Sequence, residues 1–315
     1  MTRYVLRRLI GMIPTLLVLL FIVVSLVRLL PGNVADLLLS DGRATAASKA
    51  QLSAKLGLDQ SLPEAYVRYA AGVMRGDLGK SLWTDVPVTE MILSRSAITA
   101  EVALIAIAVS IVISIPLGAT SAVRPDGLLD YSLRSMSIAG ISVPNFVIAQ
   151  AIIVLPALWF STSIPFQYKS FTENPQQHLA VVLPAALVLG LRLSATIARM
   201  MRTTLLDVLQ QDYMRTARAK GLTDFTVIVK HGLKNALIPV VTLLGLQLAA
   251  LIGGSVITES MFALPGIGRL LLDAITRRDY PVIQGVVVSV GVLVMMTNLL
   301  VDLSYGFLDP RIRYS

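Results

Sequence analysis

One polar, basic stretch between two very apolar segments decides how this chain is organised, and it reads Asp212-Tyr213-Met214-Arg215-Thr216-Ala217-Arg218-Ala219-Lys220-Gly221-Leu222. It closes at Asn235-Ala236-Leu237-Ile238-Pro239, where the next apolar segment begins. Small residues occupy one helical face, and a glycine follows them. Because glycine permits a turn and proline is tolerated in the first turn of a helix, the pattern predicts a short helix, a turn and a second helix. We interpret this stretch as a docking surface for another protein.

The composition is that of a membrane protein. Of 315 residues, 55% are hydrophobic and only 15% are charged, and the mean hydropathy is +0.74. A soluble domain of this size needs more polar and charged residues on its surface. The net charge of +8 is better explained by basic residues that flank membrane spans than by a nucleic-acid partner, which we do not expect. The absence of cysteine excludes disulfides, thiol nucleophiles and cysteine-based metal sites.

Six segments are long and apolar enough to cross a bilayer, which takes about 20 residues per helix. They are Leu9 to Leu30, Ile98 to Val123, Ile138 to Phe160, Leu179 to Met201, Leu237 to Ile257 and Val282 to Leu303. The first is too long for a signal-peptide core and has no cleavage site after it, so we expect it to be retained. Pro144 and Pro156 can kink the third. We predict an all-α membrane protein with six transmembrane helices.

The basic residues predict the orientation of these spans. They gather before the first span, after the second, in the stretch after the fourth, and after the last: Arg3, Arg7, Arg8, Arg124, Arg134, Arg215, Arg218, Lys220, Arg311 and Arg313. The positive-inside rule therefore places both termini and the basic stretch in the cytoplasm.

The long segment 31–96 then lies on the outer side. Apolar residues in it follow amphipathic helical spacing: Leu52, Leu56, Tyr66, Val67, Tyr69, Ala70 and Val73. We expect a small helical extracytoplasmic domain between the first two spans.

Several separated stretches resemble one known family. In the basic stretch the motif is Thr216-Ala217-Arg218-Ala219-Lys220-Gly221. In the outer segment the motifs are Gly57-Leu58-Asp59-Gln60 and Arg75-Gly76-Asp77-Leu78-Gly79. Near the C-terminus the motif is Leu308-Asp309-Pro310-Arg311-Ile312-Arg313-Tyr314. The chain is similar from end to end to the inner-membrane permease subunits of ATP-binding-cassette (ABC) importers. Within them it resembles the dipeptide/oligopeptide/nickel branch, and there the B-type dipeptide-permease subunit. Other branches open the loop with Glu-Ala-Ala, which this chain lacks.

The resemblance implies a domain plan and a set of partners. Residues 1–30 hold the N-terminus and first span, 31–96 the outer domain, and 97–315 the permease core with a coupling loop over 203–236. The implied partners are a second homologous permease subunit, two cytoplasmic ATP-binding subunits and an extracytoplasmic substrate-binding protein, in a bacterial inner membrane. ATP and Mg²⁺ would bind the ATP-binding subunits, and this chain would hold no cofactor. The residues carried over as the ATPase-coupling element are Thr216, Ala217, Arg218, Ala219, Lys220, Gly221 and Leu222.

The function that the resemblance implies is half of a path for short peptides, working by alternating access. Related importers carry nickel, glutathione or another small solute, so those substrates stay open. A stand-alone secondary transporter is the alternative of another class. It predicts internal inverted repeats and a larger number of functional ionisable groups at mid-membrane, and the sequence shows neither.

We do not expect an enzyme. Gly79-Lys80-Ser81 ends like a phosphate-binding loop, but Met74 stands where that motif needs a glycine. The two histidines, His178 and His231, are far apart and have no metal-ligand neighbours at a useful spacing.

Three residues are candidates for the translocation path. Arg192 lies inside a span, where a charge is costly, so it either lines a water-filled path or reaches the interface or Asp302. Asn145 and Gln247 either face the path or join helices by hydrogen bonds. The loop Leu264-Pro265-Gly266-Ile267-Gly268 either re-enters the membrane or forms an ordinary turn.

Overall fold

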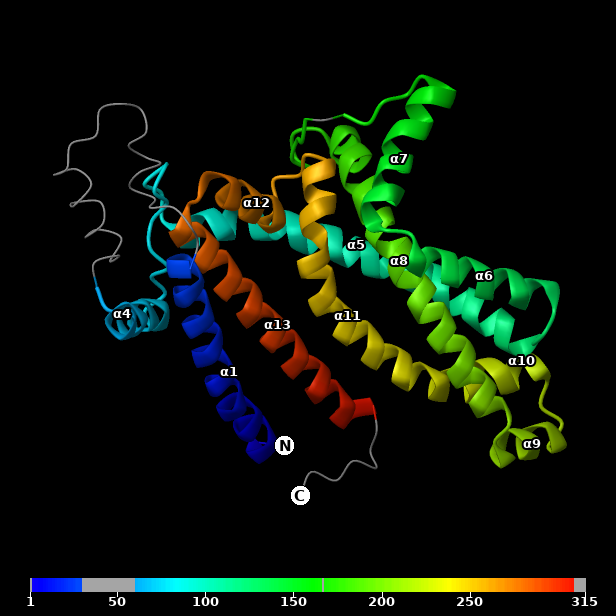
Figure 1. The fold of residues 1–315 in the computed structure, drawn as a ribbon. Coiled ribbons are helices and arrows are strands. Elements are labelled where there is room, and N and C mark those ends of the chain that lie inside the picture. Colours follow the sequence, from blue (N-terminus) through cyan, green and yellow to red (C-terminus); the bar gives the residue numbers. More distant parts are fainter. Residues whose placement is uncertain (1, 30–59, 166, 309–315) are drawn as a thin grey trace. The chain divides into compact units, whose positions relative to one another are not determined.

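The computed structural model describes residues 2–29, 60–165 and 167–308, and these are almost entirely helical (Figure 1). The predicted all-α membrane fold is confirmed. The closing motif after Leu308 and the outer positions Leu52 and Leu56 lie outside the described residues. In chain order the elements are α1 (Thr2–Leu29), α4 (Leu62–Met74), α5 (Val88–Val123), α6 (Leu128–Ser142), α7 (Asn145–Phe160), α8 (Pro175–Leu209), α9 (Asp212–Ala219), α10 (Asp224–Thr226), the π-helix η1 (Val227–Leu233), α11 (Lys234–Met261), α12 (Ile267–Arg277) and α13 (Tyr280–Leu308).

Five helical stretches among the described residues are long and apolar enough to cross a membrane, and a sixth is reached if the bent pair α6 and α7 counts as one span. The five are Leu6–Leu26, Val88–Val123, Pro175–Leu209, Asp224–Leu248 and Tyr280–Leu303. Each overlaps a predicted span. The helices are longer than the apolar segments, because α5 and α8 continue past them with polar turns.

The third predicted span, Ile138 to Phe160, is broken at Pro144, where we expected at most a kink. α6 and α7 meet at an angle of 100°, and Val143 and Pro144 between them have extended backbone. Proline lacks an N–H and disfavours the helical conformation of the residue before it, so Pro144 ends one helix and begins the next. Pro156, by contrast, stays inside α7.

The chain forms two compact units, residues 1–96 with 270–295 and residues 97–269 with 296–315. In the first unit, α1 and α4 pack through Leu20, Val23 and Tyr66. A second set of contacts joins the segment after α4 to the end of α12 and the residues that follow it. Ser81 donates to the Asp279 carboxylate at 2.5 Å, and the Trp83 indole N–H donates to the Arg277 carbonyl at 3.0 Å.

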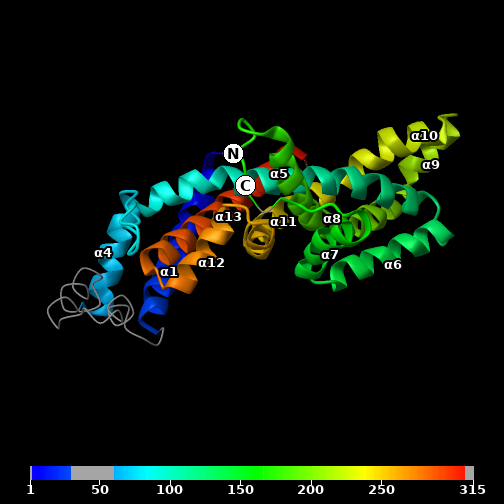
Figure 2. The same ribbon diagram turned by 90° about the horizontal axis from the view of Figure 1, so that it is seen from above.

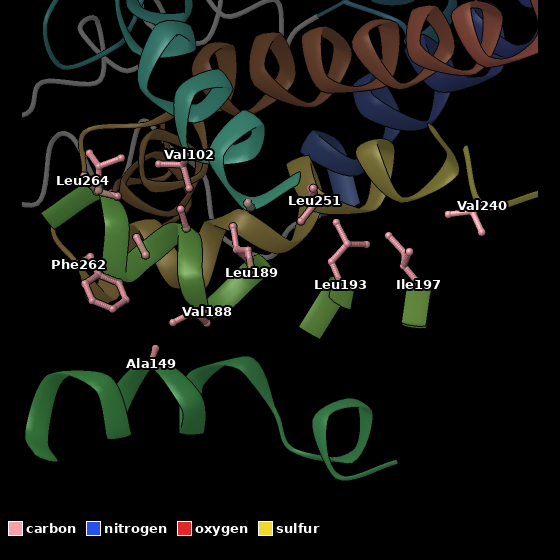
Figure 3. Packing of buried hydrophobic residues seen from close by; sticks show 14 of the residues in the cluster. Val102, Ala149, Val188, Leu189, Leu193, Ile197, Val240, Leu251, Phe262 and Leu264 are labelled. Atoms are coloured by element: carbon pink, nitrogen blue, oxygen red, sulfur yellow. The ribbon is translucent and has the colours of Figure 1, made fainter. Parts of the chain in front are cut away.

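The second unit is built around α8, on which α6, α7 and α11 pack. Figure 3 shows its core: Leu189, Leu193 and Ile197 of α8 lie among apolar side chains of the neighbouring helices. The helices approach closely where side chains are small. A Cβ on Gly118 of α5 would lie 2.6 Å from the Ala198 carbonyl of α8, and one on Gly190 would lie 2.8 Å from the Ala106 carbonyl. Such backbone contact is typical of helix pairs in membranes.

We predict that Gly118→Ala destabilises the chain by about 1–3 kcal/mol, because the added methyl forces α5 and α8 apart. Gly253→Ala is the matched control. A Cβ there meets nothing within 4 Å, and alanine is the better helix former by about 1 kcal/mol. Thermal unfolding of the purified variants in detergent checks this, and equal stability of the two would contradict the close packing.

A buried carboxylate joins three helices of the second unit. Asp130, at the start of α6, has no exposed surface. Arg202 of α8 binds it through two nitrogens, at 2.5 Å and 2.7 Å, and Arg134 of α6 and the hydroxyl of Ser121 on α5 also donate to it. The side chain thus links α5, α6 and α8 at one end of the unit.

A second buried carboxylate holds the turn before α12. Glu259 of α11 accepts from the Thr99 hydroxyl at 2.8 Å and from the Arg269 backbone N–H at 3.1 Å. A Cβ on Gly266 would lie 2.4 Å from this carboxyl group. The glycine is therefore required for the close approach. The carboxylate accepts from one of the free N–H groups that every helix start exposes, and the Thr99 hydroxyl accepts from the Ile267 N–H. Leu264 to Gly268 form a turn that leads into α12.

Candidate functional site

The stretch that follows α8 is a compact helical cap, which we call the docking segment (residues 212–233). α9 and α10 lie beside each other at one end of α8 (Figures 1 and 2). The order of short helix, turn and second helix agrees with the prediction from the sequence. The second helix begins as α10 and then widens into the π-helix η1.

The inner face of the docking segment is apolar. Met214, Ala217 and Val227 are buried together and pack against Val208 and Leu209 at the end of α8. Ala217 and Ala219 are the small residues that the sequence places in the predicted docking helix. Ala219 is exposed, but Ala217 is only 8% exposed, so its small side chain serves the packing of α9 within this chain.

The turn between α9 and α10 depends on Gly221. Its φ of +80° lies in the left-handed region that glycine adopts without strain, as the sequence predicted. The Gly221 N–H donates to the Arg218 carbonyl at 2.9 Å. Across the turn, the Arg218 guanidinium pairs with Asp224 at 3.2 Å, and Thr223 caps α10 by accepting from the Thr226 N–H. These bonds fix the angle between the two helices.

The outer face of the docking segment carries exposed cations and exposed apolar side chains. Arg215, Arg218 and Lys220 are exposed. Next to them in the chain, Tyr213, Leu222 and Phe225 are exposed by 43%, 41% and 76%. Aromatic residues and arginine are enriched in protein interfaces. The sequence reasoning missed Tyr213 and Phe225, although aromatic residues in an otherwise polar stretch were a usable signal.

The docking segment is hydrogen-bonded to α11, and α11 is hydrogen-bonded to α8. The Asn235 amide donates to the Tyr213 hydroxyl at 2.9 Å, and the Thr204 hydroxyl of α8 donates to the Ala236 carbonyl of α11 at 3.1 Å. η1 continues into α11 without a break. π-Helical turns are rare and frequently lie at functional sites. The docking segment is therefore continuous with α11 and packs against the end of α8.

The three path candidates lie on three different helices. Arg192 is exposed on α8, Gln247 is half-buried on α11, and Asn145 is half-buried at the start of α7. No hydrogen bond within the described part of the chain joins any two of them. The Asn145 Oδ1 atom is buried and has no hydrogen-bond partner there.

Two family models together match nearly the whole sequence. The model "Binding-protein-dependent transport system inner membrane component" matches residues 114–314, and its N-terminal counterpart matches residues 1–108. The chain belongs to this family.

Curated relatives match this binding-protein-dependent permease over its full length. It is 36% identical to the dipeptide transport system permease protein DppB of Escherichia coli K12, over 100% of this chain and 99% of the relative. It is 40% identical to the glutathione transport system permease protein GsiC of Pectobacterium atrosepticum, over all of both chains. The resemblance to peptide permeases found in the sequence is confirmed.

Solved structures support the fold. A chain of the MetNI methionine ABC transporter in an inward-facing conformation aligns with a TM-score of 0.57 at 20% identity, over 70% of this chain and 96% of that one. A chain of an amino acid ABC transporter with histidines aligns with a TM-score of 0.54 at 15% identity, over 70% and 94%. This permease is thus a multi-pass membrane subunit of an ABC importer.

Proposed function

We propose that the chain forms half of a path for short peptides in an ATP-driven importer of the bacterial inner membrane. A second, homologous permease subunit supplies the other half, two cytoplasmic ATPase subunits bind and hydrolyse ATP with Mg²⁺, and an extracytoplasmic binding protein delivers the peptide. Support for the peptide comes from the relatives, which are named for dipeptides, glutathione and peptides.

The docking segment is the observation that carries this proposal. Its inner face is packed and its turn is fixed, so its outer face is held in one orientation. In the proposed mechanism this face, with residues Thr216 to Leu222 at its centre, sits in a groove of an ATPase subunit. When ATP draws the two ATPases together, α9 and η1 move with them. The movement reaches α8 and α11 and switches the path between inward- and outward-facing states.

The orientation follows from the same proposal. The docking segment and both termini lie in the cytoplasm, whereas α4 and the residues around it lie outside, where the binding protein docks. Arg192, Asn145 and Gln247 are proposed to line the path, with Arg192 available to meet a peptide carboxylate.

The proposal is tested by pull-down of the tagged chain from detergent-solubilised membranes of cells that make the whole importer. Gly221→Asp should lower recovery of the ATPase by about tenfold, because it strains the turn and places a negative charge on a basic face. Gly76→Asp is the matched control: Gly76 has φ +77°, and neither glycine has an atom within 4 Å of an added Cβ.

The two variants share the same backbone strain, so only the place of the charge differs. ATPase loss with Gly221→Asp but not with Gly76→Asp supports the docking segment as the coupling element. If the wild-type chain is recovered without an ATPase and transports without ATP after reconstitution, the secondary transporter becomes the better explanation.

The substrate is tested in proteoliposomes that hold the whole importer and its binding protein. We expect ATP-dependent uptake of a labelled dipeptide or tripeptide. Within the described ranges no group of three or more His, Cys, Asp or Glu side chains could hold a metal ion, which argues against nickel being held by this part of the chain. Uptake of nickel and not of peptides would overturn the peptide assignment.

A further inference from the structure

A cavity of about 370 Å³ lies in the second unit beside the Asp130 ion pairs, and the docking segment does not use it. It is bounded by α5, α6 and α8. Its polar lining comprises Ser121, Arg134, Ser137, Arg199, Arg202 and Thr203. No local pattern in the sequence predicts this cavity, because its residues come from separate segments of the chain.

The cavity brings together three guanidinium groups, and some of their N–H donors have no acceptor among the described residues. Asp130 forms ion pairs with Arg202 and Arg134, and Arg134 also pairs with Asp126 at 3.0 Å. The Arg134 Nε atom, however, is buried and has no acceptor in the described part of the chain. Arg199 is exposed and has no ion pair among the described residues. Three cations against two carboxylates leave a net positive charge, so the cavity favours an anion.

The rest of the lining is apolar. Leu117, Leu133, Ile138 and Ala198 form the walls beside the arginines. A cavity of this volume is far larger than an inorganic phosphate, and a free anion gains nothing from apolar walls. An amphiphile with an anionic head and a hydrocarbon tail satisfies both kinds of surface.

The depth of the cavity agrees with such a ligand. Leu117 precedes the end of α5 at Val123 by about 9 Å, and Arg199 precedes the end of α8 at Leu209 by about 15 Å, at 1.5 Å of rise per residue. The apolar part of α8 ends near Met201, so Arg199 and Arg202 stand where a membrane span passes from hydrocarbon to head groups. Basic pockets between membrane helices at this level bind anionic lipid head groups.

We propose that this cavity binds one anionic membrane phospholipid, whose phosphate accepts hydrogen bonds from Arg199 and Arg134 and whose acyl chain lies along Leu117, Leu133 and Ile138. The bound lipid bridges α5, α6 and α8 just before the docking segment begins. It therefore adds stability at the end of the unit that receives the force from a partner. This proposal does not depend on which substrate is carried.

The test is thermal unfolding of the purified, delipidated importer in detergent, with phosphatidylglycerol, phosphatidylcholine or inorganic phosphate added in turn. We expect phosphatidylglycerol to raise the melting temperature of the wild type more than phosphatidylcholine or inorganic phosphate does. Arg199→Gln should lose most of that difference, because it removes the cation without touching the Asp130 pairs. Arg68→Gln is the charge-matched control: Arg68 is exposed on α4, in the other unit, and its variant should keep the full shift.

A second variant separates a lipid from a free anion. Ser137→Phe fills the cavity and keeps every charge, so it should displace the acyl chain and reduce the phosphatidylglycerol shift, with Ser137→Leu as the smaller filler if the first does not fold. If inorganic phosphate alone gives the whole shift and Ser137→Phe retains it, the cavity is a free-anion site and the lipid assignment is wrong. An equal shift with both lipids, or a shift that Arg199→Gln and Ser137→Phe leave intact, overturns the proposal as well.

Discussion

Asp130→Asn should destabilise the chain by about 3 kcal/mol, the low end of the range for breaking a buried ion pair. The side chain has no exposed surface, and it binds Arg202 through two hydrogen bonds. Asparagine keeps the shape but removes the negative charge, and its amide N–H₂ would face the guanidinium groups. Arg202 would then be a partly buried cation without a counter-ion. We place the loss at the low end because Arg134, the second cation, is 39% exposed and water reaches it.

The measurement is thermal unfolding of the purified chain in detergent, with the amount inserted in membranes as a second readout. Asp126→Asn is the matched control, since Asp126 pairs with the same Arg134 but its side chain is 73% exposed. We expect Asp126→Asn to lower the free energy of unfolding by less than about 1 kcal/mol, as for most exposed ion pairs. Equal losses in the two variants would show that burial of Asp130 does not matter.

Ala217→Glu should detach α9 from the rest of the docking segment and abolish ATP-driven transport. Ala217 is 8% exposed and packs with Met214 and Val227, so a glutamate there must either bury an unpaired charge or push the helix away. Burial of such a charge costs several kcal/mol, more than the packing of one short helix supplies. We therefore expect faster amide hydrogen exchange over residues 212–219 and loss of the ATPase in pull-downs.

Ala219→Glu serves as the control two residues further along the same helix. Its site is exposed, so exchange over α9 should stay as slow as in the wild type. It adds the same charge to the segment, so the comparison isolates burial. If amide hydrogen exchange over α9 is as slow in Ala217→Glu as in Ala219→Glu, packing of the inner face does not hold the helix in place.

Local features of this fold were predictable from the sequence because they depend on neighbouring residues. Apolar runs of sufficient length located the spans, and Gly221 marked a turn because only glycine adopts its backbone without strain. The break between α6 and α7 at Pro144 was harder to predict. Membrane helices often tolerate proline, as Pro156 shows inside α7, so sequence alone did not separate a kink from a 100° turn.

Long-range features were not predictable in the same way. Nothing in the sequence near Asp130 indicates that Arg202, 72 positions later, turns toward it. Glu259 and Thr99 are 160 positions apart, and their contact exists only once α5 and α11 have packed. The inward position of Ala217 also depends on the path of η1. Helical spacing shows that α9 has two faces, but not which face the rest of the chain covers.

The uninterrupted course of α10, η1 and α11 from Asp224 to Met261 has a mechanical consequence. The helix has no loop in it, although α11 bends along its length (Figure 1). In the proposed mechanism, a movement of the docking segment would therefore enter α11 along continuous helical backbone and not across a loop. The π-helical turns of η1 lie at the base of that helix, where the proposed movement would begin.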